Sequence, residues 1–429
     1  MLLAALLAQF TVIAQNEIPI TLDEAISKAQ EKNASLQISR QEYAIAKANY
    51  ESSSAVLLPS IRVTNTSTFT NNPLNAFGFK LLQREVTAPD FNPDLLNDPG
   101  DVENFNTRIE VMQPIINVDG WKERKTANLH ARAVNLQSER NAEYMQLEVT
   151  KAFMQLQLAF RAVDVLEKAL ETAMENRALA KNSLDQGLIQ NADYLNVEVR
   201  LSEVENQLQL AKSNINNVSD YLAFLMGDNS GTIYMPASEL ALEETEVLLS
   251  AGLNPNRKDI QAQQYAVEAQ EQMLKASKSS FLPRANAMAN YEWNDSEVFG
   301  FGATNYMIGL QLSWDLFGGY KNIGKVHREK AMLEKANLSR EKYLAESELE
   351  LNKARRNLAD ATNKVHLSQL AMEQSEEAHR IVTNRFQQGL EKTTELLFSE
   401  TQYLEKELAY LQAVFEYNFN LAYVQFLTK

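Results

Sequence analysis

The chain has 429 residues, of which 45% are hydrophobic and 23% charged, with a net charge of −15 and no cysteine. The negative charge disfavours a nucleic-acid partner, because phosphate groups are bound by clusters of Lys and Arg. The absence of cysteine excludes disulfides, thiolate chemistry and cysteine-linked lipid anchors.

The N-terminus is an apolar run that ends in Val12, Ile13 and Ala14. This composition is typical of the hydrophobic core and cleavage site of a secretory signal, so we expect residues 1–14 to be a signal peptide. No other run approaches the roughly 20 apolar residues of a membrane-spanning helix. Any membrane contact must therefore use strands or a surface helix.

The next segment predicts a helix of about 35 residues, which begins with a capping box at Thr21 and Glu24 and ends before Pro59. A Thr- and Val-rich strand at 61–69 follows. Residues 71–100 hold four prolines and predict a long polar loop. From residue 105 to residue 111 apolar and polar side chains alternate, which predicts a second strand. Pro114 and Gly120 are expected to end that strand.

Residues 121–226 contain no proline and a single glycine, Gly187. Because Gly and Pro are the strongest helix breakers, this segment predicts a long helix, a turn and a shorter helix. The two arms would be roughly 100 Å and 58 Å long. In the shorter arm apolar residues recur at alternating spacings of four and three, which indicates a coiled-coil seam. The seam comprises Val204, Leu208, Ala211, Ile215, Val218, Leu222 and Leu225.

The second half of the chain repeats this order. After an irregular linker at 227–254, a helix ends at Pro283, two strands follow, and Gly319 precedes a second hairpin. Its turn is at Gly389, the only glycine of residues 325–429. We therefore expect two structural repeats, 15–226 and 255–429.

The strands of the second half alternate most regularly, at 285–294 and 305–314. Each is about ten residues long, which is the length of a tilted strand that spans a membrane. Aromatic residues near their ends, such as Trp293 and Trp314, are typical of a membrane interface. Four such strands cannot close a barrel, and open edges are not tolerated in lipid, so the sequence predicts an oligomer.

This order of elements resembles the TolC family of outer-membrane efflux proteins over essentially the whole chain after residue 14. The most specific motif is the run Arg385-Phe386-Gln387-Gln388-Gly389 followed by Glu395. The first copy keeps only Gly187 and Asp193, because Ser183 and Leu184 replace the Arg-aromatic pair. The other residues that carry the resemblance are Leu58-Pro59, Leu282-Pro283, Gln113-Pro114-Ile115-Ile116 with Gly120, and Trp314-Asp315-Leu316-Phe317-Gly318-Gly319.

The resemblance implies a mainly α fold with a membrane β part. In it, long coiled-coil hairpins form an α-barrel tunnel in the periplasm, and four strands per chain contribute to the twelve-stranded β-barrel of a homotrimer in the outer membrane. It further implies a passive exit duct that docks onto a periplasmic adaptor (membrane fusion) protein and an inner-membrane pump.

Two sets of residues at the hairpin tips are candidate functional sites. The triplets Gln186-Gly187-Leu188 and Gln388-Gly389-Leu390 each place a leucine beside a turn glycine, where it could dock a partner; the alternative is that the glycine only makes the turn. Asp193 and Glu395 follow the glycines by six residues and would form an acidic gate at the periplasmic entrance, or else only cap their helices. Asn196 and Phe398 stand where the family often has a second aspartate.

We expect no catalytic, cofactor-binding or metal site. The four histidines fall on predicted helices at spacings that suit no zinc site, and neither a phosphate-binding glycine loop nor a nucleophile elbow is present. An exit duct needs the amphipathic strands. The alternative function, an exported coiled-coil scaffold without a pore, needs only the helices.

Overall fold

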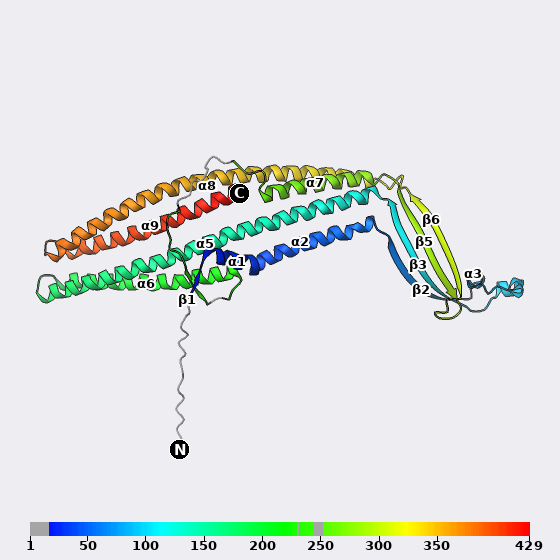
Figure 1. Ribbon diagram of the computed structural model, residues 1–429, viewed down its shortest axis with the longest axis horizontal. Helices are drawn as coiled ribbons and strands as arrows, with labels where there is room; N and C mark the ends of the chain where they lie inside the picture. The colour runs from blue at the N-terminus through cyan, green and yellow to red at the C-terminus, as the bar shows by residue number, and fades with distance from the viewer. Residues whose placement is uncertain (1–16, 230, 244–251) are drawn as a thin grey trace, which may run out of the picture. The chain divides into compact units, whose positions relative to one another are not determined.

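The computed structural model of the protein describes residues 17–229, 231–243 and 252–429 (Figure 1). The expected signal peptide lies outside the described residues, and so do residues 230 and 244–251 of the expected linker. The chain divides into two compact units. We call Met1–Gln41, Leu136–Gln261 and Tyr343–Lys429 the hairpin unit, and Glu42–Asn135 with Ala262–Lys342 the sheet unit.

Long helices and short strands make up the fold, as the sequence predicts. The first part of the chain contains β1 (Glu17–Ile20), α1 (Leu22–Lys32), α2 (Ala34–Ser52), η1 (Ser53–Val56), β2 (Ser60–Thr70), α3 (Pro73–Gln83), η2 (Ala88–Phe91), α4 (Pro93–Asn97) and β3 (Val102–Ile116). The rest contains α5 (Val118–Asp185), α6 (Asn191–Met226), β4 (Ile233–Pro236), α7 (Lys258–Ser279), β5 (Arg284–Asp295), β6 (Ala303–Ser313), α8 (Lys321–Gln387) and α9 (Thr393–Thr428).

The two predicted long-helix hairpins are confirmed, and their arms match in length. α5 and α8 have 68 and 67 residues, and α6 and α9 have 36 each. Five of the seven predicted seam residues of α6 are buried, Val204 and Leu222 completely, and Ala211 and Val218 are half-buried. Leu208 of α6 shares a buried cluster with Leu404 and Leu411 of α9, so apolar packing joins the two hairpins. Among the described residues, no helix is both long and apolar enough to cross a membrane.

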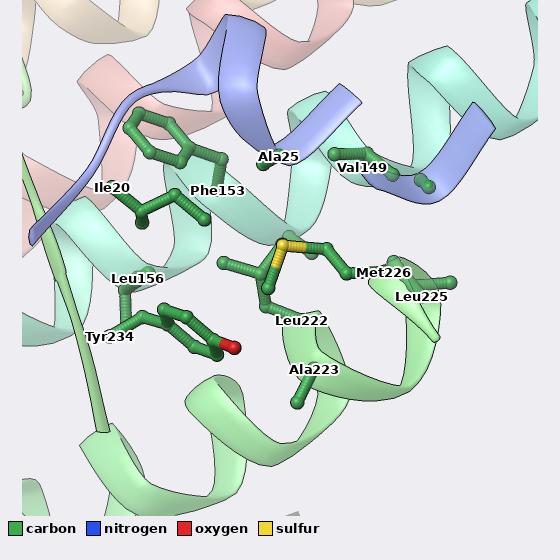
Figure 2. Packing of buried hydrophobic residues seen from close by; sticks show 12 residues of the cluster. Ile20, Ala25, Val149, Phe153, Leu156, Leu222, Ala223, Leu225, Met226 and Tyr234 are labelled. Atoms are coloured by element: carbon green, nitrogen blue, oxygen red, sulfur yellow. The ribbon is translucent and has the colours of Figure 1, made fainter. Parts of the chain in front are cut away.

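The best-buried cluster of the hairpin unit joins five elements (Figure 2). Ile20 of β1, Ala25 of α1 and Tyr234 of β4 pack against Phe153 of α5 and Leu222 of α6. β1 and β4 form a parallel pair that the sequence analysis did not predict. The two strands have four residues each and are more than 200 residues apart, so neither shows a detectable alternation.

The first predicted helix is interrupted at Asn33, which adopts an extended conformation with ψ of 124° between α1 and α2. The Asn33 side chain is buried. Its Nδ2 donates to the carbonyl oxygen of Leu225 at 2.8 Å, and its Oδ1 accepts from the N–H of Ser35 at 2.9 Å. A single continuous helix was therefore the wrong expectation, because this bond to the end of α6 fixes a break that helical periodicity does not reveal.

β2, β3, β5 and β6 form an antiparallel sheet in that order, with β2 and β6 at its edges. Residues directly opposite one another share a face, so the register defines two faces. One face is polar and carries Arg108 opposite Glu292, with 2.7 Å between Nη2 and Oε2. The other face is apolar and includes Ile308 and Leu310 of β6, which are 76% and 82% exposed.

The predicted loop at 71–100 contains ordered helices, which corrects that expectation. Pro73 and Pro93 begin α3 and α4, since proline is favoured in the first helical turn and lacks only an N–H that would be unpaired there. The Arg84 guanidinium, just past α3, donates to the carbonyl oxygen of Thr304 in β6 at 2.8 Å. The segment is thereby tied to the end of the sheet.

Candidate functional site at the hairpin tips

The first hairpin turns through Gly187, whose φ of +70° is a left-handed conformation. The N–H of Gly187 donates to the carbonyl oxygen of Leu184, and the N–H of Leu188 donates to that of Ser183, both at 2.9 Å. This pair of bonds is a Schellman cap, which satisfies the last carbonyl groups of α5. A residue with a Cβ would pay roughly 1–2 kcal/mol in this conformation.

The second hairpin closes in the same way. Gly389 has a φ of +71°, its N–H donates to Phe386, and the N–H of Leu390 donates to Arg385, both at 2.9 Å. In addition, Nε of Arg385 lies 3.1 Å from Oε2 of Glu391 across the turn. The first tip has Ser183 and Ile189 at these places, so it lacks this ion pair.

The two turn leucines project into solvent. The side chain that follows a Schellman glycine usually packs against the last turn of its own helix. Here Leu188 is 72% exposed and Leu390 is 64% exposed, and the preceding Gln186 and Gln388 are exposed as well. Each tip therefore presents an apolar side chain that its own hairpin does not cover.

The two candidate gate acids occupy the third position of their helices but make different contacts. Oδ2 of Asp193 accepts the N–H of Gln190 at 3.1 Å, which caps α6. Glu395 is exposed, and its side chain makes no hydrogen bond or ion pair within the described part of the chain. Asp193 thus has a structural contact, whereas the Glu395 carboxylate is exposed to solvent.

A buried polar cluster between the hairpins was missed by the sequence analysis. Nε of Arg200 in α6 lies 3.1 Å from Oε1 of Glu400 in α9, and Nδ2 of Asn176 in α5 donates to Oε2 of Glu400 at 2.8 Å. The side chains of Arg200 and Glu400 are only 6% and 4% exposed. Most acids on a long helix face solvent, and Glu400 is buried instead because its partners come from two other helices.

His379 of α8 lies close to this cluster. Its Nδ1 is 3.1 Å from Oγ of Ser399, and its ring stacks on that of Tyr403. Burial lowers the pKa of His379, and the nearby Glu400 carboxylate only partly opposes that effect. Burial thus favours the neutral form of the ring, which packs against Tyr403.

A second buried polar cluster lies around Asp259 at the start of α7. Nε of Arg257 donates to Oδ1 of Asp259 at 2.7 Å, and the Tyr343 hydroxyl donates to Oδ2 at 2.5 Å. Burial alone would raise the pKa of Asp259, but these two hydrogen bonds outweigh it and the pKa is lowered. Arg257 also donates to the carbonyl oxygen of Leu427, so this cluster anchors the end of α9.

The proposed corner residues lie at several kinds of position. Pro59 lies between η1 and β2, and Pro283 lies between α7 and β5. Gly319, with a φ of +62°, precedes α8. Pro114 does not end β3, contrary to expectation; it lies inside the strand at a register shift between Pro114 and Ile116. Proline is tolerated at such an irregularity because no ladder N–H is needed there.

Gly120 does not end a strand either, because it lies in the first turn of α5. Its N–H donates to Oδ1 of Asn117 at 3.2 Å. A Cβ at residue 120 would lie 2.8 Å from Nδ2 of Asn117, so glycine makes room for this capping side chain. Gly120 therefore does mark the boundary between β3 and α5, but it belongs to the start of the helix and not to the end of the strand.

Within the described residues no three His, Cys, Asp or Glu side chains gather as a metal site. The exposed groups at the tips are the two turns, the side chains of Leu188 and Leu390, and carboxylates. Such groups can contact a protein partner or passing ions.

The sequence matches the family model described as outer membrane efflux protein over residues 25–228 and 251–423. No curated protein sequence matches the chain. Three solved structures illustrate the likeness in fold. A membrane protein from Pseudomonas aeruginosa matches with a TM-score of 0.82 and 15% identity, over 95% of this chain and 92% of that one.

The outer membrane protein VceC of Vibrio cholerae matches with a TM-score of 0.79 and 17% identity, over 95% of this chain and 96% of that one. The CmeC outer membrane channel of Campylobacter jejuni matches with a TM-score of 0.80 and 15% identity, over 95% of this chain and 85% of that one. At such identities the likeness shows that the fold is shared.

Proposed function

The chain belongs to the outer membrane efflux protein family, and from this premise we propose that it is a trimeric, passive exit duct. As a family member, the protein is located in the bacterial outer membrane and extends into the periplasm. In our proposal three chains close one twelve-stranded barrel in the membrane. Their helices continue it as a tunnel, and solutes pass through without chemical change.

The observation that carries this proposal is the four-stranded sheet with an apolar outer row. Ile308, Leu310 and Leu312 of the edge strand β6 are 76%, 82% and 70% exposed, an arrangement that is unfavourable in water and favourable in lipid. The unpaired edges of β2 and β6 need strands of other copies, since lipid cannot satisfy backbone groups. If the protein were a scaffold that uses only its coiled coils, the exposed apolar residues of β6 would have no function.

Native mass spectrometry of the detergent-extracted protein tests the assembly. After the detergent is removed in the gas phase, we expect the mass of three chains and no peak at the mass of one chain. A monomer that is soluble without detergent would favour the scaffold function instead.

We further propose that the two tips dock a periplasmic adaptor protein and, through it, an inner-membrane pump. The support is that Leu188 and Leu390 occupy equivalent positions in two Schellman turns and are both uncovered. A turn that served only to reverse the chain would need the glycines but not the paired exposed leucines. Docking would bury both side chains against a partner.

We predict that the double variant Leu188→Asp, Leu390→Asp abolishes drug export in cells while trimers form normally. A carboxylate at residue 188 or 390 cannot enter an apolar pocket of a partner without a large desolvation cost. The measurement is drug resistance together with the yield of trimer. The matched control, Leu188→Met with Leu390→Met, keeps an apolar side chain and should keep resistance. Normal resistance in the aspartate variant would contradict docking at the tips.

We also propose an acidic gate at the entrance, made by Asp193 and Glu395 from each chain. Carboxylates that converge on one opening favour cations over anions. Glu395 supports the gate because it is exposed and unpaired in the described structure, whereas Asp193 already accepts the N–H of Gln190. The gate is therefore expected to depend more on Glu395 than on Asp193.

For this gate, the variant Asp193→Asn, Glu395→Gln should lose its cation preference in single-channel recording and resist block by trivalent cations. Its melting temperature should stay close to that of the wild type, because Asn still offers a capping oxygen at residue 193. Asp185→Asn is the matched control, since Asp185 is an exposed acid near the tip that pairs with Lys181. Unchanged selectivity in the double variant would contradict the gate.

A further inference from the structure

Three methionines gather on the polar face of the sheet, apart from the apolar clusters of the protein. Met112 of β3 lies directly opposite Met288 of β5. Met288 in turn lies opposite Gly309 of β6, and Met307 precedes Gly309 by two residues on the same face. The three thioethers thus occupy two successive rows on three adjacent strands.

The register brings Met288 within reach of Met112 on one side and of Met307 on the other. Directly opposite residues have Cβ atoms about 4.5–5.5 Å apart, and diagonal neighbours about 7–8 Å, which long side chains can span. Methionine has three rotatable bonds, so its sulfur can adapt its position. A Cβ at Gly309 would lie 3.1 Å from Cε of Met288, so the end of Met288 already lies over β6, the strand that carries Met307.

Burial in an apolar core does not account for this cluster. Met154 and Met226 fill the helical cores at 4% and 0% exposure, whereas Met307 is 52% exposed and Met112 and Met288 are half-buried. The neighbouring residues on this face are polar, and they include the ion pair between Arg108 and Glu292. The thioethers are therefore accessible to solutes. The nearest charged residues in the register are Glu110, in the same row as Met307, and Arg62 of β2, which lies opposite Glu110.

We propose that Met288 binds soft monovalent metal cations, Cu(I) or Ag(I), together with either Met112 or Met307, which flank it and lie too far apart to ligate the same ion. Thioether sulfur is a soft ligand that selects such ions over hard cations such as Mg²⁺. Gly309 is part of the site because it leaves room for the end of Met288. The proposal rests on the proposed function only in placing this face inside the pore, where each chain would contribute one site.

Methyl NMR of the detergent-extracted, methyl-¹³C-methionine protein tests the site directly, with silver nitrate as the probe in chloride-free buffer. Single Met→Leu substitutions assign the resonances among the twelve methionines. We expect silver to shift the resonance of Met288 and that of Met112, Met307 or both. Met174 and Met332, which are 51% and 48% exposed on helices, serve as internal controls and should not move. Equal shifts at the controls, or no shifts at the three sites, would overturn the proposal. Magnesium should shift none of them.

Two variants extend the test. The triple variant Met112→Leu, Met288→Leu, Met307→Leu keeps the side-chain volumes and should abolish the block of channel current by micromolar silver without lowering the conductance itself. Gly309→Ala keeps all three sulfurs but crowds Met288, and should weaken silver binding by roughly tenfold or more. Wild-type silver affinity in Gly309→Ala, or persistent silver block in the triple variant, would contradict the site.

The two proposals can fail separately. If the wild-type protein conducts but silver neither blocks it nor shifts its methionine resonances, the silver site is refuted and the duct function stands. If the protein does not conduct, the NMR titration still tests the silver site.

Discussion

Arginine in place of Leu310 should prevent most of the protein from assembling in the outer membrane. Leu310 is 82% exposed on the apolar face of β6, so a charge there would face lipid. On the lipid side of a barrel, arginine costs about 2–4 kcal/mol near the bilayer midplane. We expect the yield of trimer in outer-membrane fractions, measured by immunoblotting, to fall sharply.

Gln311 provides the matched control, because it is the next residue on the same strand but lies on the polar face, opposite Asn286. Gln311→Arg adds the same charge where water is expected and should leave the trimer yield near that of the wild type. Equal yields of the Leu310→Arg and Gln311→Arg variants would contradict the assignment of the apolar face to lipid.

The second large effect is expected at the buried ion pair between the hairpins. Glu400→Ala removes the carboxylate that Arg200 and Asn176 both contact. It leaves a guanidinium that is 6% exposed, with only the exposed Glu203 carboxylate 3.6 Å away. Breaking a buried pair from one side typically costs about 3–5 kcal/mol, because an uncompensated charge stays buried. We expect a marked fall in the melting temperature of the helices, followed by circular dichroism in detergent.

A fully apolar replacement tests whether that loss comes from the orphaned charge. The variant Asn176→Leu, Arg200→Met, Glu400→Leu buries no polar group at this place, and such replacements are often neutral or stabilising. It should melt near or above the wild type. If Glu400→Ala melts with the wild type, the contact is not formed in the folded protein.

The hairpins were predictable because their signals are local. Gly187 and Gly389 are the only breakers in long stretches free of proline, and both adopt the left-handed turn that glycine favours. The strands were predictable from alternation, since one face of the sheet is apolar and the other polar. The leucines beside the two turn glycines were visible in the sequence as well, whereas their exposure is a property of the fold.

The remaining features depend on contacts between residues far apart in the chain. Asn33 breaks a helix because it bonds to Leu225, and Glu400 is buried because Arg200 meets it from another hairpin. The sequence around Asn33 or Glu400 does not distinguish either residue from an exposed residue of a helix. The pairing of β1 with β4 is of the same kind, because two strands of four residues gain their stability only from each other and the helices beneath.

Recording current across a planar lipid bilayer tests whether the protein is a duct. Purified wild-type trimers should insert and conduct in discrete, uniform steps, and a detergent blank should not. Gln311→Arg should conduct as well. The protein is not a duct if its trimers insert into the bilayer, shown by protection of their strands from protease, and yet never raise the current above that of the bare bilayer.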